Sequence, residues 1–153
     1  MYVNRFARCE VSVTEDDLVA VERAFAVIIH AELRRHYLFC NGGVPEKTCW
    51  IQPGWEPTCL TMFLPVRPRW ITDPRFARRC SLQDTLDDVL DGPHIPPGLV
   101  PFAQDWGGNY FCVDGDTGGV YFYAMDSGDD FEGGKRYLVG SLKTFIDNLV
   151  EEA

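Results

Sequence analysis

The sequence predicts an α+β fold, with helices packed on a mixed, mainly antiparallel sheet. Four segments repeat apolar residues at helical spacing, and short apolar runs bounded by glycine and proline lie between them. Helical and strand segments follow the order helices, strand, helix, strands, helix, whereas α/β proteins alternate the two types. The length of 153 residues and the apolar content of 46% suit a folded chain, and we expect a single domain over 1–153.

Two helices are predicted in the first part of the chain. Thr14 is a good N-cap, and residues 15–17 place acidic side chains at the positive end of the helix dipole. An apolar stripe follows at helical spacing: Leu18, Val21, Phe25 and Ile28. A second helix is expected over residues 31–40. Residues that accept the left-handed conformation end it, and these are Asn41, Gly42 and Gly43.

The rest of the chain is expected to contain short strands and two more helices. Prolines and Gly54 make residues 44–58 irregular, and Ser81 and Ser141 are good N-caps for the helices that follow them. We expect these helices to reach residue 90 and residue 150, with their apolar stripes inward. Strands are expected over residues 58–64, 99–103, 109–113, 120–125 and, at an edge, 137–139.

The six cysteines are expected to be reduced, non-catalytic thiols. Their spacing shows no paired pattern, and the first residues carry no apolar segment typical of an export signal. The longest apolar run, residues 24–29, is too short to cross a bilayer. We therefore expect a cytoplasmic protein without a membrane partner, in which Cys40 and Cys112 are largely buried.

Charge is unevenly distributed along the chain, whose net charge is −9. Residues 1–80 carry 11 basic and 9 acidic side chains, and residues 81–153 carry 3 basic and 14 acidic ones. An acidic surface repels phosphate, so we expect no nucleic-acid partner. It attracts a basic protein partner, although simple solubility explains the same composition.

No pattern in the sequence indicates catalysis, a metal or a cofactor. The segment 114–119 begins like a calcium-binding loop, but Met125 stands where that loop needs a bidentate glutamate. No cysteine or histidine pair has zinc-site spacing, and no motif fits a serine hydrolase or a phosphate-binding loop. We expect no metal, no cofactor and no enzyme activity. A Cys–His site assembled from distant residues stays open as an alternative.

A candidate partner-binding surface follows the strand predicted at 120–125. A glycine-flanked loop there cannot bury its four carboxylates, which are those of Asp126, Asp129, Asp130 and Glu132. Trp55 lies in a proline-flanked loop, and tryptophan commonly anchors protein interfaces. The alternative is a solvated loop and a tryptophan that folds back onto the core.

The segment 101–115, PFAQDWGGNYFCVDG, has the residue types of an active site or of a tight turn. The carboxylate of Asp105 suits a turn, because it can accept backbone N–H bonds there. Gly107 and Gly108 can take positive φ, and Asn109 can tie the turn to the next strand. We interpret Asp105, Gly108 and Asn109 as architecture.

Three motifs in a fixed order carry a family resemblance. A helix ends in Asn-Gly-Gly, and a strand of the form Gly-Val-Tyr, with Val120 and Tyr121, lies near the other end of the matching region. Between them a strand leads into a turn with Phe102, Ala103, Asp105, Gly108, Asn109 and Tyr110. This arrangement resembles the SUKH superfamily, which includes a yeast regulator of cell-wall synthesis and many bacterial immunity proteins. The resemblance spans roughly residues 14–125.

The resemblance implies an SUKH-like fold, no catalysis and a protein partner. The function that the resemblance implies first is that of an immunity protein, as in polymorphic toxin and contact-dependent inhibition systems. Such a protein binds a cognate bacterial toxin domain and blocks the surface of the toxin. Many such toxin domains are basic nucleases, which an acidic surface complements. The alternative is a regulatory or scaffold domain of the same fold with no toxin partner.

Overall fold

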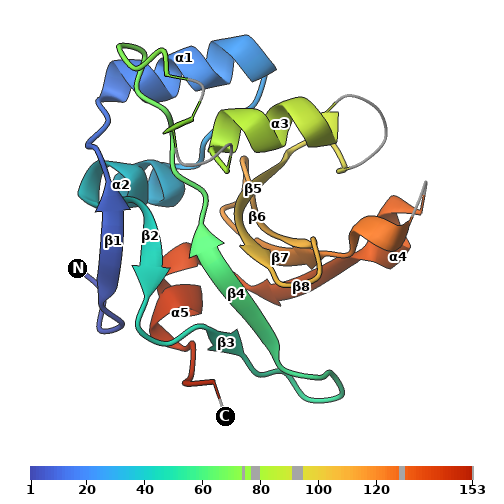
Figure 1. The fold of residues 1–153 in the computed structure, drawn as a ribbon. Coiled ribbons are helices and arrows are strands. Elements are labelled where there is room, and N and C mark those ends of the chain that lie inside the picture. The colour runs from blue at the N-terminus through green and yellow to red at the C-terminus, as the bar shows by residue number, and fades with distance from the viewer. Residues whose placement is uncertain (74, 77–79, 91–94, 128–129, 153) are drawn as a thin grey trace.

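The computed structural model has an α+β fold, as predicted, with helices packed on a curled antiparallel sheet (Figure 1). The structure describes residues 1–73, 75–76, 80–90, 95–127 and 130–152. Its helices are α1 (Glu15–Phe25), α2 (Ala31–Phe39), α3 (Leu82–Leu90), the short 3-10 helix η2 (Met125–Ser127), α4 (Phe131–Gly134) and α5 (Leu142–Asp147). Figure 1 shows α1 and α3 side by side at one end, with α2 next to β2.

Two sheets contain the strands. The larger has the order β3 (Cys49–Trp50), β4 (Thr58–Phe63), β5 (Leu99–Asp105), β6 (Tyr110–Asp114), β7 (Val120–Tyr123) and β8 (Lys135–Val139). The smaller pairs β1 (Phe6–Glu10) with β2 (Asn41–Pro45). Every strand pair within the described residues is antiparallel, and the strand order shows that neighbours in the larger sheet are successive strands of the chain.

Apolar side chains cover both faces of the larger sheet, because successive residues of a strand point to opposite sides. On one face the Phe145 ring of α5 lies 5.7 Å from Phe102 and 5.3 Å from Phe111, measured between ring centroids. On the other face Cys112 and Tyr123 pack with Val89 of α3 in a second, smaller cluster. The strand β6 therefore contributes to both clusters.

The predicted N-caps are confirmed. The Thr14 side chain accepts the backbone N–H of Asp17, whose carboxylate accepts the backbone N–H of Thr14 in return, which is a capping box. Ser81 and Ser141 accept the N–H groups three residues ahead of them. These local hydrogen bonds fix the starts of three helices close to the predicted positions.

Two helix ends were predicted too far along the chain. The α1 helix ends at Phe25, because Ala26 takes the left-handed conformation at φ 53°, and Ile28 is exposed instead of buried. The α5 helix ends at Asp147, and Val150 forms an isolated bridge with Cys49. Backbone pairing, which an apolar stripe does not reveal, replaces the last helical turn.

The prediction of an irregular segment at 44–58 is wrong where β2 extends to Pro45 and where β3 covers Cys49–Trp50. Asn41, Gly42 and Gly43 do not cap α2 but begin β2, and Cys40 is the C-cap residue. The two glycines do have positive φ, 78° and 82°. The strand β1, which pairs with them, was not predicted, because most of its side chains are exposed and show no apolar alternation.

Four of the six cysteines form disulfides, which contradicts the prediction of reduced thiols. Cys9 of β1 is bonded to Cys40 at the end of α2, and Cys49 is bonded to Cys59, its register partner across β3 and β4. The cysteines of the first pair are 31 positions apart in the sequence, and those of the second pair are 10 apart. Each pair meets only after folding, so the spacing shows no paired motif. Cys40 and Cys112 are buried, as predicted. The cytoplasmic location stays a prediction.

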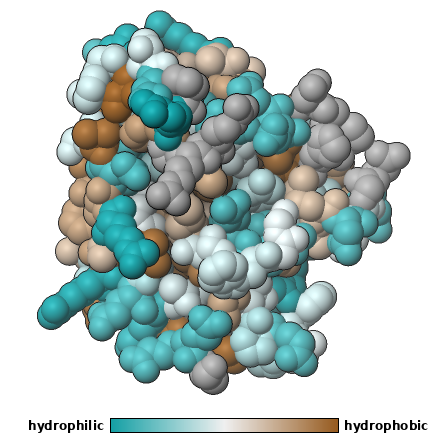
Figure 2. Space-filling model, viewed as in Figure 1, coloured by the Kyte–Doolittle hydropathy of each residue, from teal (hydrophilic) through white to brown (hydrophobic). Residues whose placement is uncertain are grey.

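No helix within the described residues is long and apolar enough to span a membrane. Hydrophilic side chains cover most of the face seen in Figure 2, where hydrophobic residues lie in small separate patches.

Candidate protein-binding groove

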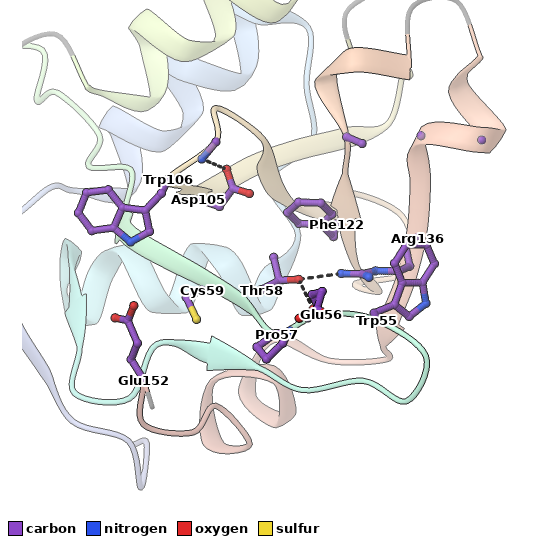
Figure 3. Close-up of a pocket in the computed structure, with 14 residues that line it drawn as sticks. Trp55, Glu56, Pro57, Thr58, Cys59, Asp105, Trp106, Phe122, Arg136 and Glu152 are labelled. Carbon is purple, nitrogen blue, oxygen red and sulfur yellow. Dashed lines mark hydrogen bonds between the residues drawn. The ribbon is translucent and has the colours of Figure 1, made fainter.

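A groove of about 540 Å³ lies at the end of the sheet face that carries Phe122 (Figure 3). Phe122 is the register partner of Phe111, so the groove continues the face on which α5 packs. Four segments border it: the β3–β4 loop from Trp55 on, the β5–β6 turn at Trp106, the junction of α4 with β8, and the chain after α5 at Glu152. These segments are far apart in sequence, and the antiparallel register brings them together.

Arg136 and Trp55 form one wall of the groove. The guanidinium carbon of Arg136 lies 4.1 Å from the ring centroid of Trp55 and 5.2 Å from that of Phe122. Its Nη2 donates to the hydroxyl of Thr58 at 3.0 Å. Its Nε is buried and has no hydrogen-bond partner within the described residues, and burial lowers the pKa of Arg136 from its usual value. Trp55 thus stacks on Arg136 instead of folding back onto the core, and 58% of it is exposed.

The opposite side of the groove carries Trp106, which is 79% exposed at the tip of the β5–β6 turn. Asp105 holds this turn through Oδ1, which accepts the N–H groups of Gly107 at 2.9 Å and of Asn109 at 2.8 Å. Oδ2 accepts Nδ2 of Asn109 at 3.2 Å. Gly108 takes φ 83°, whereas Gly107 does not have positive φ, which was expected of both. The side-chain oxygen of Asn109 accepts the N–H of Met125 at 2.9 Å and so ties the turn to the end of β7.

Acidic side chains outnumber basic ones in the groove. Glu56, Asp105 and Glu152 line it, and Arg136 is the one basic residue among its described lining residues. Glu152 reaches the groove because the chain after α5 bridges back to β3, where the N–H of Val150 donates to the carbonyl of Cys49 at 2.8 Å. In Figure 3 Trp106 and Glu152 lie on one side, and Trp55 and Arg136 lie on the other.

The predicted acidic loop adjoins this groove through α4. Asp126, Asp130 and Glu132 are exposed, and Gly133 and Gly134, which follow Glu132 directly, line the groove. Asp130 also caps α4, since its Oδ1 accepts the N–H of Gly133 at 2.9 Å. Glu132 pairs with Lys135 at 3.7 Å. Asp129 lies outside the described residues. Trp55 and the two glycines that end α4, Gly133 and Gly134, therefore line the same groove.

Asn41, Gly42 and Gly43 lie away from the groove, inside the smaller sheet. Nδ2 of Asn41 donates to the carbonyls of Val11 and Val66, and its Oδ1 accepts the N–H of Val66 at 2.7 Å. A Cβ atom on Gly42 would lie 2.9 Å from Cβ of Pro65. These contacts join β2 to the segments that follow β1 and β4, so we assign these three residues a structural role.

The buried titratable groups outside the groove do not resemble a catalytic site. Burial raises the pKa of the Cys112 thiol and lowers the pKa of His36 to about 4, and the hydrogen bond of His36 to the Gly42 carbonyl opposes the second shift only in part. Neither group is suited to proton exchange with solvent at neutral pH. Within the described residues no cluster of three or more His, Cys, Asp or Glu side chains has metal-site geometry.

Sequence reasoning missed Trp106, Phe122, Arg136 and Glu152. The signal for Trp106 was available, because a tryptophan inside a tight Asp-Trp-Gly-Gly-Asn turn has little room to bury its ring. The other three belong to a strand pair and a returning terminal segment whose register is not readable from spacing. Only the folded chain brings them into the groove that Trp55 lines.

A comparison with protein families supports the resemblance noted in the sequence. The SMI1 / KNR4 family (SUKH-1) matches residues 12–148, a range that begins just before α1 and ends just after α5. It includes the Asn-Gly-Gly segment, the Asp105 turn, and the described groove residues except Glu152. No curated protein and no solved structure matches the chain. Because the match covers most of its length, the chain belongs to the SMI1/KNR4 family (SUKH-1).

Proposed function

We propose that this chain is an immunity protein that binds a cognate bacterial toxin domain and neutralises it by covering its surface. The SUKH family includes toxin immunity proteins, so a protein partner is the expectation for a member. The groove and the adjoining acidic loop of Asp126, Asp129, Asp130 and Glu132 are the surface that we assign to this partner. No catalytic step is part of the proposal.

The observation that carries the proposal is the pair of exposed tryptophans on one groove. Trp55 and Trp106 are 58% and 79% exposed. Exposing two large indole rings to water is unfavourable, and tryptophan is enriched among the residues that dominate binding energy at interfaces. A partner that covers the groove would remove both rings from water, whereas a purely structural role leaves their exposure unexplained.

Charge favours a basic toxin, such as a nuclease. The groove has more acidic than basic lining residues, and exposed carboxylates extend from it along α4. Such a surface would speed the approach of a basic domain and would compete with nucleic acid for the same positive patch. The same proposal accounts for the acidic excess of residues 81–153.

The test uses the toxin domain encoded beside the gene for this chain. Co-expression of this chain should restore the growth of cells that produce the toxin, and the purified proteins should form a stable complex. The Trp55→Ala, Trp106→Ala double variant, which alters two exposed side chains, should stay folded and lose protection. Failure of the unaltered chain to bind or protect would contradict the immunity role and favour a regulatory or scaffold domain of the same fold.

A further inference from the structure

The two tryptophans of the groove have different surroundings. The ring of Trp55 already has a cation against it, because the Arg136 guanidinium lies 4.1 Å from its centroid. The ring of Trp106 makes no aromatic or cation–π contact with any residue that the structure describes, and 79% of it is exposed. The Trp55 ring therefore already holds a cation from the chain itself, and the Trp106 ring does not.

Two of the three groove carboxylates, Asp105 and Glu152, lie on the Trp106 side, and they differ in their partners. Asp105 uses both oxygens within its own turn. Glu152 makes no ion pair or side-chain hydrogen bond within the described part of the chain, and Figure 3 shows its carboxylate directed toward the Trp106 side. An exposed indole and an unpaired carboxylate on one side of a groove suit a cation. Arg136 repels a second cation from the other side.

We propose that the Trp106 side of the groove receives an arginine side chain from the partner protein. The planar guanidinium stacks on the Trp106 ring while its N–H groups face the Glu152 carboxylate, an arrangement that the point charge of lysine matches less well. The Arg136–Trp55 pair forms the opposite wall and sets where the arginine can enter. This inference rests on the proposed function, because it specifies which partner side chain the groove binds.

The test measures the affinity of the neighbouring-gene toxin domain for single variants of this chain by titration calorimetry. We expect Trp106→Ala to weaken binding by about tenfold or more, and Glu152→Gln by about threefold. Glu152→Lys should weaken it further, because it places a cation beside the incoming arginine. The double variant of Trp106 and Glu152 should lose less than the product of the single losses, since both residues contact one side chain.

Matched controls come from the same chain. Trp70→Ala removes a tryptophan that is 70% exposed but does not line the groove, and Glu151→Gln neutralises the residue next to Glu152. Both controls should bind like the unaltered chain. Equal melting temperatures for all variants would show that folding is intact.

Two negative results lead to different conclusions. A stable complex whose affinity is unchanged by Trp106→Ala and by Glu152→Lys overturns the arginine site and leaves the immunity function standing. The absence of any complex or growth protection by the unaltered chain overturns the proposed function, and the arginine site with it.

Discussion

Asp105 is the residue that shapes the Trp106 turn. Its carboxylate accepts two backbone N–H groups and the side-chain amide of Asn109. The side-chain oxygen of Asn109 in turn accepts the backbone N–H of Met125. Asp105 thus holds Trp106 in place without needing to contact a partner. A residue of this kind affects stability directly and binding only through the position of its neighbour.

Replacing Asp105 with alanine should lower the free energy of unfolding by about 1–3 kcal/mol, because it leaves turn donors without their acceptor. Urea unfolding of both proteins measures the difference. Asp105→Asn, which keeps an oxygen acceptor, should lose less. A variant that keeps its melting temperature but loses binding would show that the Asp105 turn serves binding and not stability.

His36 is fully buried between α2 and the small sheet. The Tyr2 hydroxyl lies 3.2 Å from Nδ1, and Nε2 lies 3.2 Å from the carbonyl oxygen of Gly42. A neutral ring with its proton on Nε2 satisfies both contacts, since it accepts from Tyr2 and donates to Gly42. Burial lowers the pKa of His36 to about 4, so the folded chain keeps the ring neutral.

This shift predicts a loss of stability in mild acid. Between pH 6.5 and pH 4 the unfolded chain binds a proton at His36 and the folded chain does not, so the free energy of unfolding falls as the pH falls. The contribution of His36 to the free energy of unfolding is complete above about pH 6.5 and should fall by about 2 kcal/mol by pH 5. Urea unfolding of the unaltered chain and of the His36→Gln variant at pH 7.5, 6 and 5 isolates the effect of His36. The other titratable groups are present in both proteins, so their contributions cancel in the difference between the two free energies of unfolding. Parallel pH profiles would show that the histidine does not titrate in this range.

The end of α1 illustrates how a single backbone angle limits an element. Ala26 adopts φ 53° and ψ 43°, a left-handed conformation in which its Cβ is unfavourable. Glycine is the usual residue at such a position, because it has no Cβ. The helix therefore stops three residues before Ile28, although the apolar spacing continues.

Ala26→Gly should raise the free energy of unfolding by about 0.5–1 kcal/mol. The control is Ala24→Gly, two residues earlier and also exposed, which should lower it by about 1 kcal/mol because Ala24 is inside the helix. Thermal unfolding of the two variants should move in opposite directions. Destabilisation by both would mean that Ala26 is not held in the left-handed conformation in solution.

The acidic segment around α4 should influence how fast a basic toxin associates. Neutralising its four acids, Asp126, Asp129, Asp130 and Glu132, should lower the association rate constant at low salt and flatten its salt dependence. Asparagine at position 130 keeps the helix cap, so α4 should remain folded. Stopped-flow or surface-based kinetics at two salt concentrations measure the effect. The control neutralises four exposed acids elsewhere: Glu10, Asp16, Glu46 and Asp116. An effect no larger than in this control would rule the segment out as a steering surface.

The helices were predictable because their determinants are local. Thr14, Ser81 and Ser141 each bond within three residues of themselves, and the apolar stripes of these helices repeat within a few turns. The strand β1 has no such signal, and β3 is two residues long. Only the two tryptophans of the groove had a signal in the sequence, because its other members come together through the pairing of Phe122 with Arg136 and the bridge at Val150.

The molecule as a whole contains two covalent links whose pairing followed from no sequence motif. Peptide mapping of the unreduced, alkylated protein should recover one peptide pair joined through Cys9 and Cys40 and another joined through Cys49 and Cys59. Reduction before alkylation should separate both pairs. Recovery of all four cysteines in alkylated form without reduction would restore the original expectation of reduced thiols.

The Cys49–Cys59 disulfide affects binding, because the loop between its two cysteines contains Trp55 and lines the groove. The link turns this stretch into a closed covalent ring, which has fewer conformations to lose when a partner immobilises it. Replacing both cysteines by serine should therefore weaken the complex through a larger entropic penalty, whereas the same change at Cys9 and Cys40 should alter stability alone. A chain in an oxidising compartment would present a groove with one wall already ordered, and a chain in a reducing compartment would have to order that wall with each binding event.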